Sequence, residues 1–153
     1  MTSPRWLDAD EQRVWRAYLT LTRLLASELD RELQQQSGIP HTYYEILVRL
    51  SEAPDRTLRM SQLAAASDSS RSRLSHAVTR LEELGWVRRD NCATDRRGLF
   101  AILTDEGFAA LVAAAPGHVE GVRQHLFDKL SREQVEQLGA ICDAVLDGLR
   151  TAE

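Results

Sequence analysis

The sequence predicts a mostly α-helical protein with a small β-hairpin wing, arranged as a winged helix-turn-helix, and three observations support this prediction. Apolar residues recur at helical spacing near both ends of the chain. Two helical patterns in the middle are separated only by the polar turn Ser67–Asp68. Two short strand patterns joined by a polar turn directly follow the second of these helices. We therefore expect an N-terminal dimerisation helix over residues 1–38, a winged helix-turn-helix over residues 39–104 and C-terminal dimerisation helices over residues 105–153.

The first helix is expected over Leu7–Gln36, where an apolar stripe with steps of three and four residues runs from Val14 to Leu33. Asp8 can cap the N-terminal end of this helix, because its side chain can accept a hydrogen bond from a free backbone N–H. The pair Ser37-Gly38 ends the helix.

The second helix of the chain is expected to begin at Pro40 and to run to about Ser51. The two helices of the helix-turn-helix follow it. We expect Ser61 to cap a short helix over Gln62–Ala66. Ser69 or Ser70 is expected to cap the next helix, which ends at Gly85 in a left-handed conformation.

The helix that begins at Arg71 has an apolar face and a cationic polar face, and there is no acidic residue between Ser69 and Arg80. Residues 69–97 hold seven arginines and four acids, a net charge of +3, so the rest of this chain of net charge −4 carries −7. Such an asymmetry would orient the protein on a polyanion, and the acidic remainder would limit indiscriminate binding. The pattern predicts double-stranded DNA as the partner.

Residues Trp86–Leu103 are expected to form the wing, two strands joined by a polar turn that contains Asp95–Gly98. The major groove of DNA admits a helix, and residues near the N-terminus of that helix contact base edges. Arg73 could bind guanine through two hydrogen bonds, whereas Arg80 is expected to contact phosphate. Arg88 and Arg89 alternate faces, so one of them is expected to face DNA. The predicted DNA-binding residues are Ser70, Arg71, Ser72, Arg73, Ser75, His76, Thr79, Arg80, Arg88, Asp95, Arg96 and Arg97.

Both C-terminal helices have clear boundary signals. Thr104 is expected to cap the first, and Pro116-Gly117 is expected to kink or break it. Ser131 and Gln134 form a capping box at the start of the last helix, whose apolar stripe ends at Leu149. A central unit of roughly 70 residues cannot cover apolar stripes at both ends of the chain. We therefore expect the ends to pack on each other and on a second copy, as a homodimer.

Several sequence pieces in this order resemble the MarR family of bacterial transcription regulators. They are SQLAAAS at 61–67, VTRLEELGWVRR at 78–89, DRRG at 95–98 and LTDEG at 103–107. The resemblance covers nearly the whole chain and implies a homodimer whose terminal helices form a dimerisation lobe. It also implies gene repression, with release of DNA when a small molecule or an oxidant binds. It assigns Arg96 or Arg97 to the minor groove, where negative potential favours arginine, with Asp95 orienting an arginine.

The resemblance further implies a ligand pocket between the dimerisation lobe and the DNA-binding lobe. Trp15, His41, Tyr44 and Arg49 are the candidate lining residues, which would suit an aromatic or phenolic acid through stacking and charge pairing. His118 and His125 could share a helix face and, with His41 or a glutamate, bind zinc, but two spaced histidines are thin evidence and we assign no metal site.

The two cysteines are expected to be free thiols, with Cys92 exposed on the hairpin and Cys142 packed on the last apolar stripe. Arginines near Cys92 would lower its pKa, which leaves an oxidant-responsive regulator as an alternative. Relatives that sense oxidants typically use a cysteine near the first helix, and this chain has none there.

The remaining features exclude several classes of protein. There is no apolar run of transmembrane length and no signal peptide, so we expect a cytoplasmic protein without a membrane partner. No catalytic motif or cofactor-binding motif is present, so neither an enzyme nor a bound cofactor is expected. The sequence predicts a sequence-specific transcription regulator, a repressor that binds a pseudo-palindromic operator and is released by a small molecule. The alternatives from other classes are a winged-helix protein-interaction module without DNA binding and a small enzyme.

Overall fold

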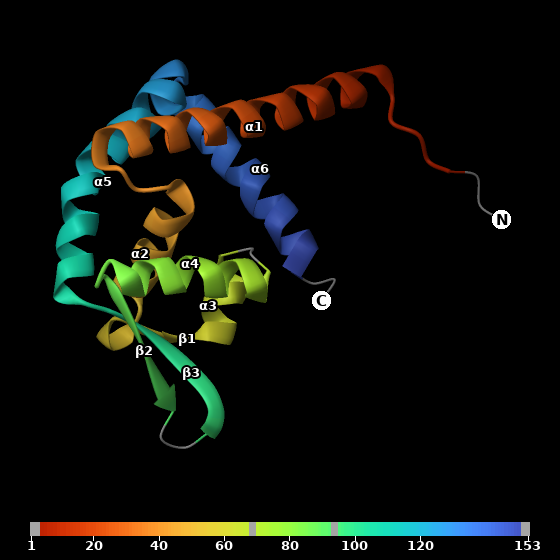
Figure 1. The fold of residues 1–153 in the computed structure, drawn as a ribbon. Helices are drawn as coiled ribbons and strands as arrows, with labels where there is room; N and C mark the ends of the chain where they lie inside the picture. The colour runs from red at the N-terminus through yellow and green to blue at the C-terminus, as the bar shows by residue number, and fades with distance from the viewer. Residues whose placement is uncertain (1–3, 68–69, 93–94, 151–153) are drawn as a thin grey trace. The chain divides into compact units, whose positions relative to one another are not determined.

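The computed structural model describes residues 4–67, 70–92 and 95–150, and the side chains of residues 92 and 95–97 lie outside this description. The chain divides into two compact units, one formed by residues 1–29 with 119–153 and the other by residues 30–118. The described elements are mainly helices, with three short strands (Figure 1). Within the described ranges, no helix has the length and apolar character required to cross a membrane.

The first unit contains most of α1 (Ala9–Ser37), the end of α5 (Asp105–His125), the short 3-10 helix Phe127–Lys129 and α6 (Arg132–Arg150). Both predicted N-terminal caps in this unit are confirmed. The Asp8 carboxylate accepts a hydrogen bond from the backbone N–H of Glu11 at 2.8 Å. The Ser131 hydroxyl accepts one from the N–H of Gln134 at 3.2 Å, and the Gln134 side chain accepts one from the N–H of Ser131 at 2.8 Å.

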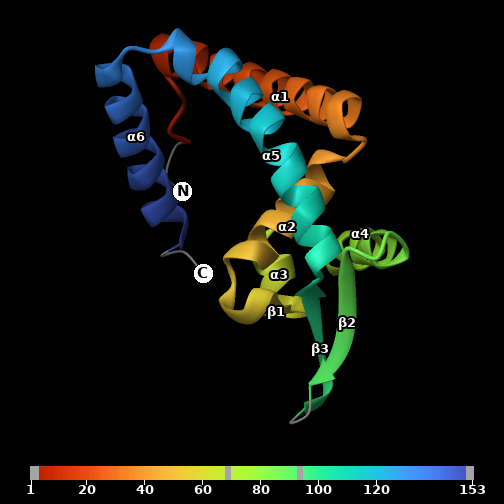
Figure 2. The ribbon, with the colours of Figure 1, turned by 90° about the vertical axis from the view of Figure 1, so that its left-hand side faces the viewer.

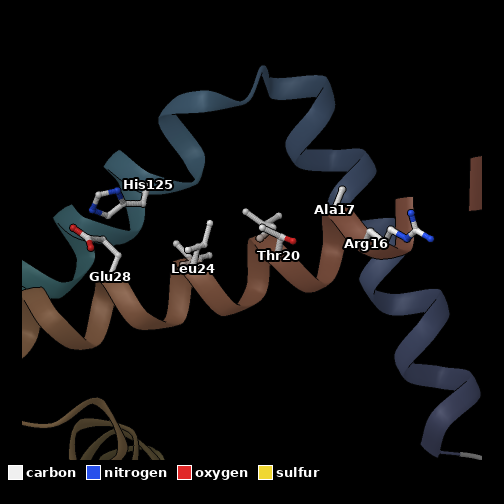
Figure 3. Close-up of a pocket in the computed structure, with 8 residues that line it drawn as sticks. Arg16, Ala17, Thr20, Leu24, Glu28 and His125 are labelled. Atoms are coloured by element: carbon white, nitrogen blue, oxygen red, sulfur yellow. The ribbon is translucent and has the colours of Figure 1, made fainter. Parts of the chain in front are cut away.

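Apolar side chains of the first unit are exposed in the single chain. No large apolar side chain among its described residues is buried. An open groove of about 720 Å³ follows α1 and is lined by Arg16, Ala17, Thr20, Leu21, Leu24, Leu25, Glu28 and His125. Figure 3 shows the side chains of Glu28 and His125 facing each other at one end of this groove. Cys142, which we expected to be packed, is exposed in the single chain, where α6 has no buried residue.

The second unit is the winged helix-turn-helix, confirmed as predicted. It contains α2 (His41–Glu52), the 3-10 turn Pro54–Arg56, β1 (Thr57–Arg59), α3 (Met60–Ala66), α4 (Arg71–Glu83), β2 (Val87–Cys92), β3 (Asp95–Leu103) and the first part of α5. The strands form an antiparallel sheet in the order β1-β3-β2. The β2–β3 hairpin projects away from the helices (Figure 2). The core of the second unit includes the fully buried Ile46, Leu47, Leu50, Leu63, Val78 and Leu81.

Three local predictions about this fold were wrong. Residues Asp95–Gly98 belong to β3 rather than to the turn of the wing. The register explains the error, because Asn91 pairs with Leu99 whereas Cys92 pairs with Asp95, so β3 holds extra residues in an irregularity that no periodic pattern reveals. The helix α3 begins at Met60 rather than at Gln62, because the Gln62 side chain accepts a hydrogen bond from the N–H of Arg59 at 3.1 Å.

The third concerns Pro116, where we expected a kink or a break: α5 continues through this residue, so the expected break is wrong. A proline inside a helix costs a hydrogen bond and crowds the preceding turn. Here Leu111 and Ala114 hold the preceding turns of the helix in the core of the second unit, so packing offsets that cost.

A tight junction between the wing and α5 accounts for the LTDEG segment. The Thr104 hydroxyl donates a hydrogen bond to the carbonyl oxygen of Gly85 at 2.7 Å and accepts one from the N–H of Gly107 at 3.0 Å. A Cβ at Gly107 would lie 2.1 Å from the carbonyl oxygen of Trp86, so a glycine is required there. Gly85 has a φ of +75° at the end of α4, as the sequence predicts.

Candidate nucleic-acid interface

The helix α4 separates an apolar face from a cationic face within the second unit. Leu74, Val78 and Leu81 are buried in the core. Arg71, Ser72, Arg73, His76 and Arg80 are exposed. The exposed face is therefore available for a partner, and burying the other face fixes the direction in which it points.

The N-terminus of α4 is held by Ser70, whose hydroxyl accepts a hydrogen bond from the backbone N–H of Arg73 at 3.3 Å. This bond satisfies one of the free N–H groups of the first turn. Ser70, predicted to contact DNA, thus has a capping role in the structure. The cap also fixes the backbone from which Arg71 and Arg73 extend.

Two of the predicted arginines form ion pairs at the surface. Arg80 Nη1 lies 2.6 Å from a carboxylate oxygen of Glu83, and Arg88 Nη1 lies 3.2 Å from one of Asp90. Exposed pairs of this kind contribute little stability and are easily exchanged for another anion. Both arginines therefore remain candidates for phosphate contacts.

A polar network joins the wing to α4. Glu82 accepts hydrogen bonds from the backbone N–H of Arg89 at 2.8 Å and from its Nε at 2.7 Å. Arg89 Nη2 donates to the hydroxyl of Thr79 at 2.9 Å, and this hydroxyl donates to the carbonyl oxygen of Ser75 at 2.9 Å. The hydrogen bond from Arg89 holds the pKa of Glu82 below its usual value of 4.5. The network sets the wing against the helix, and it engages the hydroxyl of Thr79, which we predicted to face DNA.

A cationic cavity lies at the start of α4, and it was not predicted from the sequence. It has a volume of about 360 Å³ and is lined by Arg59, Met60, Ser61, Arg71, Leu74, Ser75, Arg89, Gly98 and Leu99. Arg59 and Ser61 were missed, although the first helix of a helix-turn-helix crosses the DNA backbone and residues at its start are natural candidates. The side chains of Asp95, Arg96 and Arg97, assigned to the tip of the wing, lie outside the described residues, as does that of Cys92.

A second cavity of the same unit holds three of the four residues predicted to bind a ligand. It has a volume of about 320 Å³ and is lined by His41, Tyr44, Glu45, Val48, Arg49, Glu52 and His118. The fourth residue, Trp15, lies on α1 in the first unit, where its ring stacks on Tyr18 with ring centroids 6.1 Å apart. Glu45, Glu52 and His118 were not part of the predicted pocket.

The His118 ring lies close to two rings of α2. Its centroid is 5.4 Å from that of His41 and 4.5 Å from that of Tyr44. The buried Nδ1 of His118 has no hydrogen-bond partner among the described residues. Burial and the neighbouring His41 lower the pKa of His118, and Glu45 opposes this shift in part, so the ring is neutral at pH 7.

Known proteins of one family are similar to this chain. A sequence model described as MarR family matches residues 37–98. The transcriptional repressor MprA of Escherichia coli K12 is 28% identical over 141 residues, which cover 88% of this chain and 80% of MprA.

Two solved structures from Streptomyces coelicolor are similar over nearly the full length. Sco3205, a MarR family transcriptional regulator solved in complex with DNA, is 56% identical with a TM-score of 0.91, covering 96% of this chain and 92% of that one. AbsC, another MarR family transcriptional regulator, is 44% identical with a TM-score of 0.88, covering 97% of this chain and 99% of that one.

Proposed function

Because the chain belongs to the MarR family of transcription regulators, we propose that it represses transcription by binding a pseudo-palindromic site on double-stranded DNA as a homodimer. Members of this family are transcription regulators, and the chain is not an enzyme. The observation that carries the proposal is the exposed cationic face of α4, next to a projecting hairpin in the same unit. Cytoplasmic location is part of the proposal, because the DNA of a bacterial cell lies there.

The proposed contacts follow from how helices bind DNA. An α4 placed in the major groove brings Arg71, Ser72 and Arg73 of its first turn closest to the base edges. His76 follows one turn later, and Arg80 and Arg88 are placed at phosphates. We add Arg59 to the phosphate contacts, because it lines the cationic cavity beside Arg71. Arg96 and Arg97, with Asp95, are proposed for the minor groove.

The homodimer is supported by the exposed apolar residues of the first unit. They include Trp15, Tyr18 and Leu24 on α1 and Ile141, Val145 and Leu149 on α6. Stripes of this size are typical of interfaces between permanently associated chains. A twofold dimer would also present two α4 helices to two half-sites, which explains why a pseudo-palindromic site is proposed.

The DNA contacts can be tested by fluorescence anisotropy with a duplex selected from a random pool by the wild-type protein. We expect Arg73→Ala to lose about 1–3 kcal/mol on this duplex and much less on a scrambled one, because a base contact is lost. Removing Arg96 and Arg97 together should reduce the slope of log affinity against log salt by about one or two.

The control for this experiment is Arg13→Ala, which removes an exposed arginine of α1 outside the second unit. Its affinity should match that of the wild type on both duplexes. Equal losses on the selected and scrambled duplexes for Arg73→Ala would show that this residue does not read bases. Wild-type protein that selects no duplex would refute the function itself.

Release of DNA by an effector belongs to the same proposal, and the cavity lined by His41, Tyr44 and Arg49 is its proposed site. A ligand can release DNA only by binding the DNA-free state more tightly. A hundredfold loss of DNA affinity requires about 2.7 kcal/mol of coupling, and DNA must weaken ligand binding by the same factor. An effector whose action survives Tyr44→Ala unchanged would not bind there.

A further inference from the structure

A group of metal-ligating side chains is formed by the helix α1 and the last residue of α5, away from the proposed effector cavity. We propose that Glu28 and Glu32 of α1 and His125 of α5 bind one divalent transition-metal ion per chain, with Zn²⁺ as the reference ion. The ion would tie α1 to the end of α5. This inference goes beyond the proposed function and does not depend on DNA binding.

The ligand atoms of these three residues already lie close together. One imidazole nitrogen and one carboxylate oxygen from each glutamate lie within 4.8 Å of one another. The ligands of a tetrahedral Zn²⁺, each about 2.0–2.2 Å from the ion, are about 3.4 Å apart, so binding requires only a small contraction of the group. Among the described residues, this is the one group of three or more His, Cys, Asp or Glu side chains with such a spacing.

The backbone of α1 fixes the relation of the two carboxylates. Glu28 and Glu32 are four residues apart on one continuous helix, so their side chains extend from the same face. Figure 3 shows the carboxylate of Glu28 facing the imidazole of His125. All three side chains are half-buried. Ligands that extend from helices are held more precisely than ligands on loops, which favours a defined geometry at the ion.

The groove along α1 gives the ion an entry path and leaves one coordination position open. Glu28 and His125 both line this groove, which is open to solvent. Three protein ligands leave a fourth tetrahedral position for water, as in zinc sites with an exchangeable ligand. Ligand type, ligand number and access from solvent therefore all agree with a metal site.

The ligand set favours a transition-metal ion over Mg²⁺ or Ca²⁺. Imidazole is a ligand for ions such as Zn²⁺, whereas Mg²⁺ and Ca²⁺ are bound by oxygen atoms. The two glutamates supply two negative charges, which match a divalent cation. A neighbouring cation is Arg31, whose Nη2 lies 3.8 Å from a carboxylate oxygen of Glu32. The Arg31 side chain is 49% exposed, so water screens its charge and the pair is easily exchanged.

A bound ion would supply stability that the first unit lacks in a single copy. No large apolar side chain among the described residues of this unit is buried. An ion that binds the folded protein more tightly than the unfolded chain stabilises the fold by mass action. We therefore expect Zn²⁺ to raise the melting temperature of the wild type, and to raise that of His125→Asn much less.

The test uses the full-length protein without a histidine tag, after removal of metals with a chelator. Isothermal titration with Zn²⁺ should show one ion per chain. Glu28→Gln, Glu32→Gln and His125→Asn should each weaken Zn²⁺ binding by at least about tenfold, because loss of even an outer-shell partner typically costs about 10–100-fold. Excess Mg²⁺ should not displace the ion, since a merely acidic patch would bind both cations.

Glu120→Gln is the matched control. It removes a carboxylate of α5 that accepts a hydrogen bond from Gln124 at 2.7 Å and lies outside the group, so Zn²⁺ affinity should match that of the wild type. Circular dichroism without metal checks each fold, and His125→Gln replaces His125→Asn if the latter does not fold. Unchanged affinity in any ligand variant, a loss in Glu120→Gln, displacement by Mg²⁺ or no binding to the wild type would overturn the proposal.

The stoichiometry and the DNA-binding measurement separate this proposal from the other two. Half an ion per chain would place the ion between two copies and would overturn a site within one chain. DNA affinity is measured on the same metal-free and Zn²⁺-loaded samples. Wild-type protein that binds DNA but no Zn²⁺ would refute the metal site and leave the proposed function intact.

Discussion

The two units of this chain use apolar residues in opposite ways. In residues 30–118, apolar side chains of α2, α3, α4 and β3 close on one another, and several, such as Leu47 and Leu81, are fully buried. In the described part of the first unit, residues 4–29 and 119–150, no large apolar side chain is buried, many are exposed, and α6 has no buried residue at all. Hydrophobic burial is the main favourable term in folding, so the first unit lacks in a single copy what stabilises the second.

This difference suggests that the second unit serves DNA binding and the first unit serves assembly. The second unit is stabilised within one chain, and it carries the cationic helix α4 and the hairpin. In the proposed homodimer, a second copy would bury the exposed stripes of the first unit against the same stripes by symmetry. We therefore expect substitutions in the first unit to act on assembly and substitutions in the second to act on folding or on DNA binding.

The largest effect is expected from Val145→Asp, which tests whether the exposed stripe of α6 forms the dimer interface. Val145 is 58% exposed in the single chain, so the substitution should cost little unless a partner covers it. In a twofold dimer it would bury two carboxylates, each at a penalty of several kcal/mol. We expect a monomer, with DNA binding strongly reduced. Light scattering should report 17.2 kDa for the variant and twice that mass for the wild type.

Ala140→Asp is the matched control, because it adds the same charge to the opposite, polar face of α6. It should remain a dimer. If Val145→Asp also has the mass of the wild type, the stripe of α6 does not form the interface.

The next effect in size is that of Leu81→Ala in the core of the second unit. Leu81 is fully buried, and deleting such a side chain typically costs about 2–5 kcal/mol of unfolding free energy. The loss should be the same at all protein concentrations, because the residue packs within one chain. Urea unfolding at two concentrations measures this, with the exposed Leu99→Ala as a control whose loss is small. A loss from Leu81→Ala that grows on dilution would place Leu81 in the assembly rather than in the core.

Periodic apolar patterns account for the parts of the fold that could be predicted from the sequence. The stripes of α1, α4 and α6 were recognisable, because a helix that buries one face repeats every three or four residues. The glycine at the end of α4 and the capping box of α6 were also confirmed. These are local signals, which do not require knowledge of what packs against the helix.

Features that depend on contacts between distant residues could not be predicted. The strand β1 has three residues and forms only because β3 pairs with it, with Leu58 opposite Ala101. The network of Thr79, Glu82 and Arg89 joins a helix to a strand, and composition gives no sign of it. Of the candidate site residues, the exposed arginines of α4 followed from the helix pattern, whereas Arg59, Glu45 and His118 were brought to their cavities by tertiary structure.

The smallest effect is expected from Glu82→Gln in the network of Thr79, Glu82 and Arg89. This substitution tests whether the polar contacts of the second unit also stabilise a single chain. The Glu82 carboxylate is paired and partly buried, with 29% of its side chain exposed. Glu82→Gln replaces its charged hydrogen bonds to Arg89, which are typically worth about 1.5–3 kcal/mol, by weaker neutral ones. We expect a loss of about 1–2 kcal/mol at pH 7, independent of protein concentration, and weaker DNA binding because the wing is no longer held against α4.

The contribution of Glu82 to stability should depend on pH. The folded state lowers the pKa of Glu82, so the unfolded chain binds its proton more tightly than the folded protein does. The stabilisation is therefore complete above the usual value of 4.5 and is lost as the pH falls below it, through the lowered pKa. Glutamine has no such proton, so the difference in unfolding free energy between wild type and Glu82→Gln should shrink below pH 4.5. Other carboxylates titrate in both proteins and cancel in the difference. A difference that stays constant on both sides of that pH would mean that the charge of Glu82 does not hold the wing.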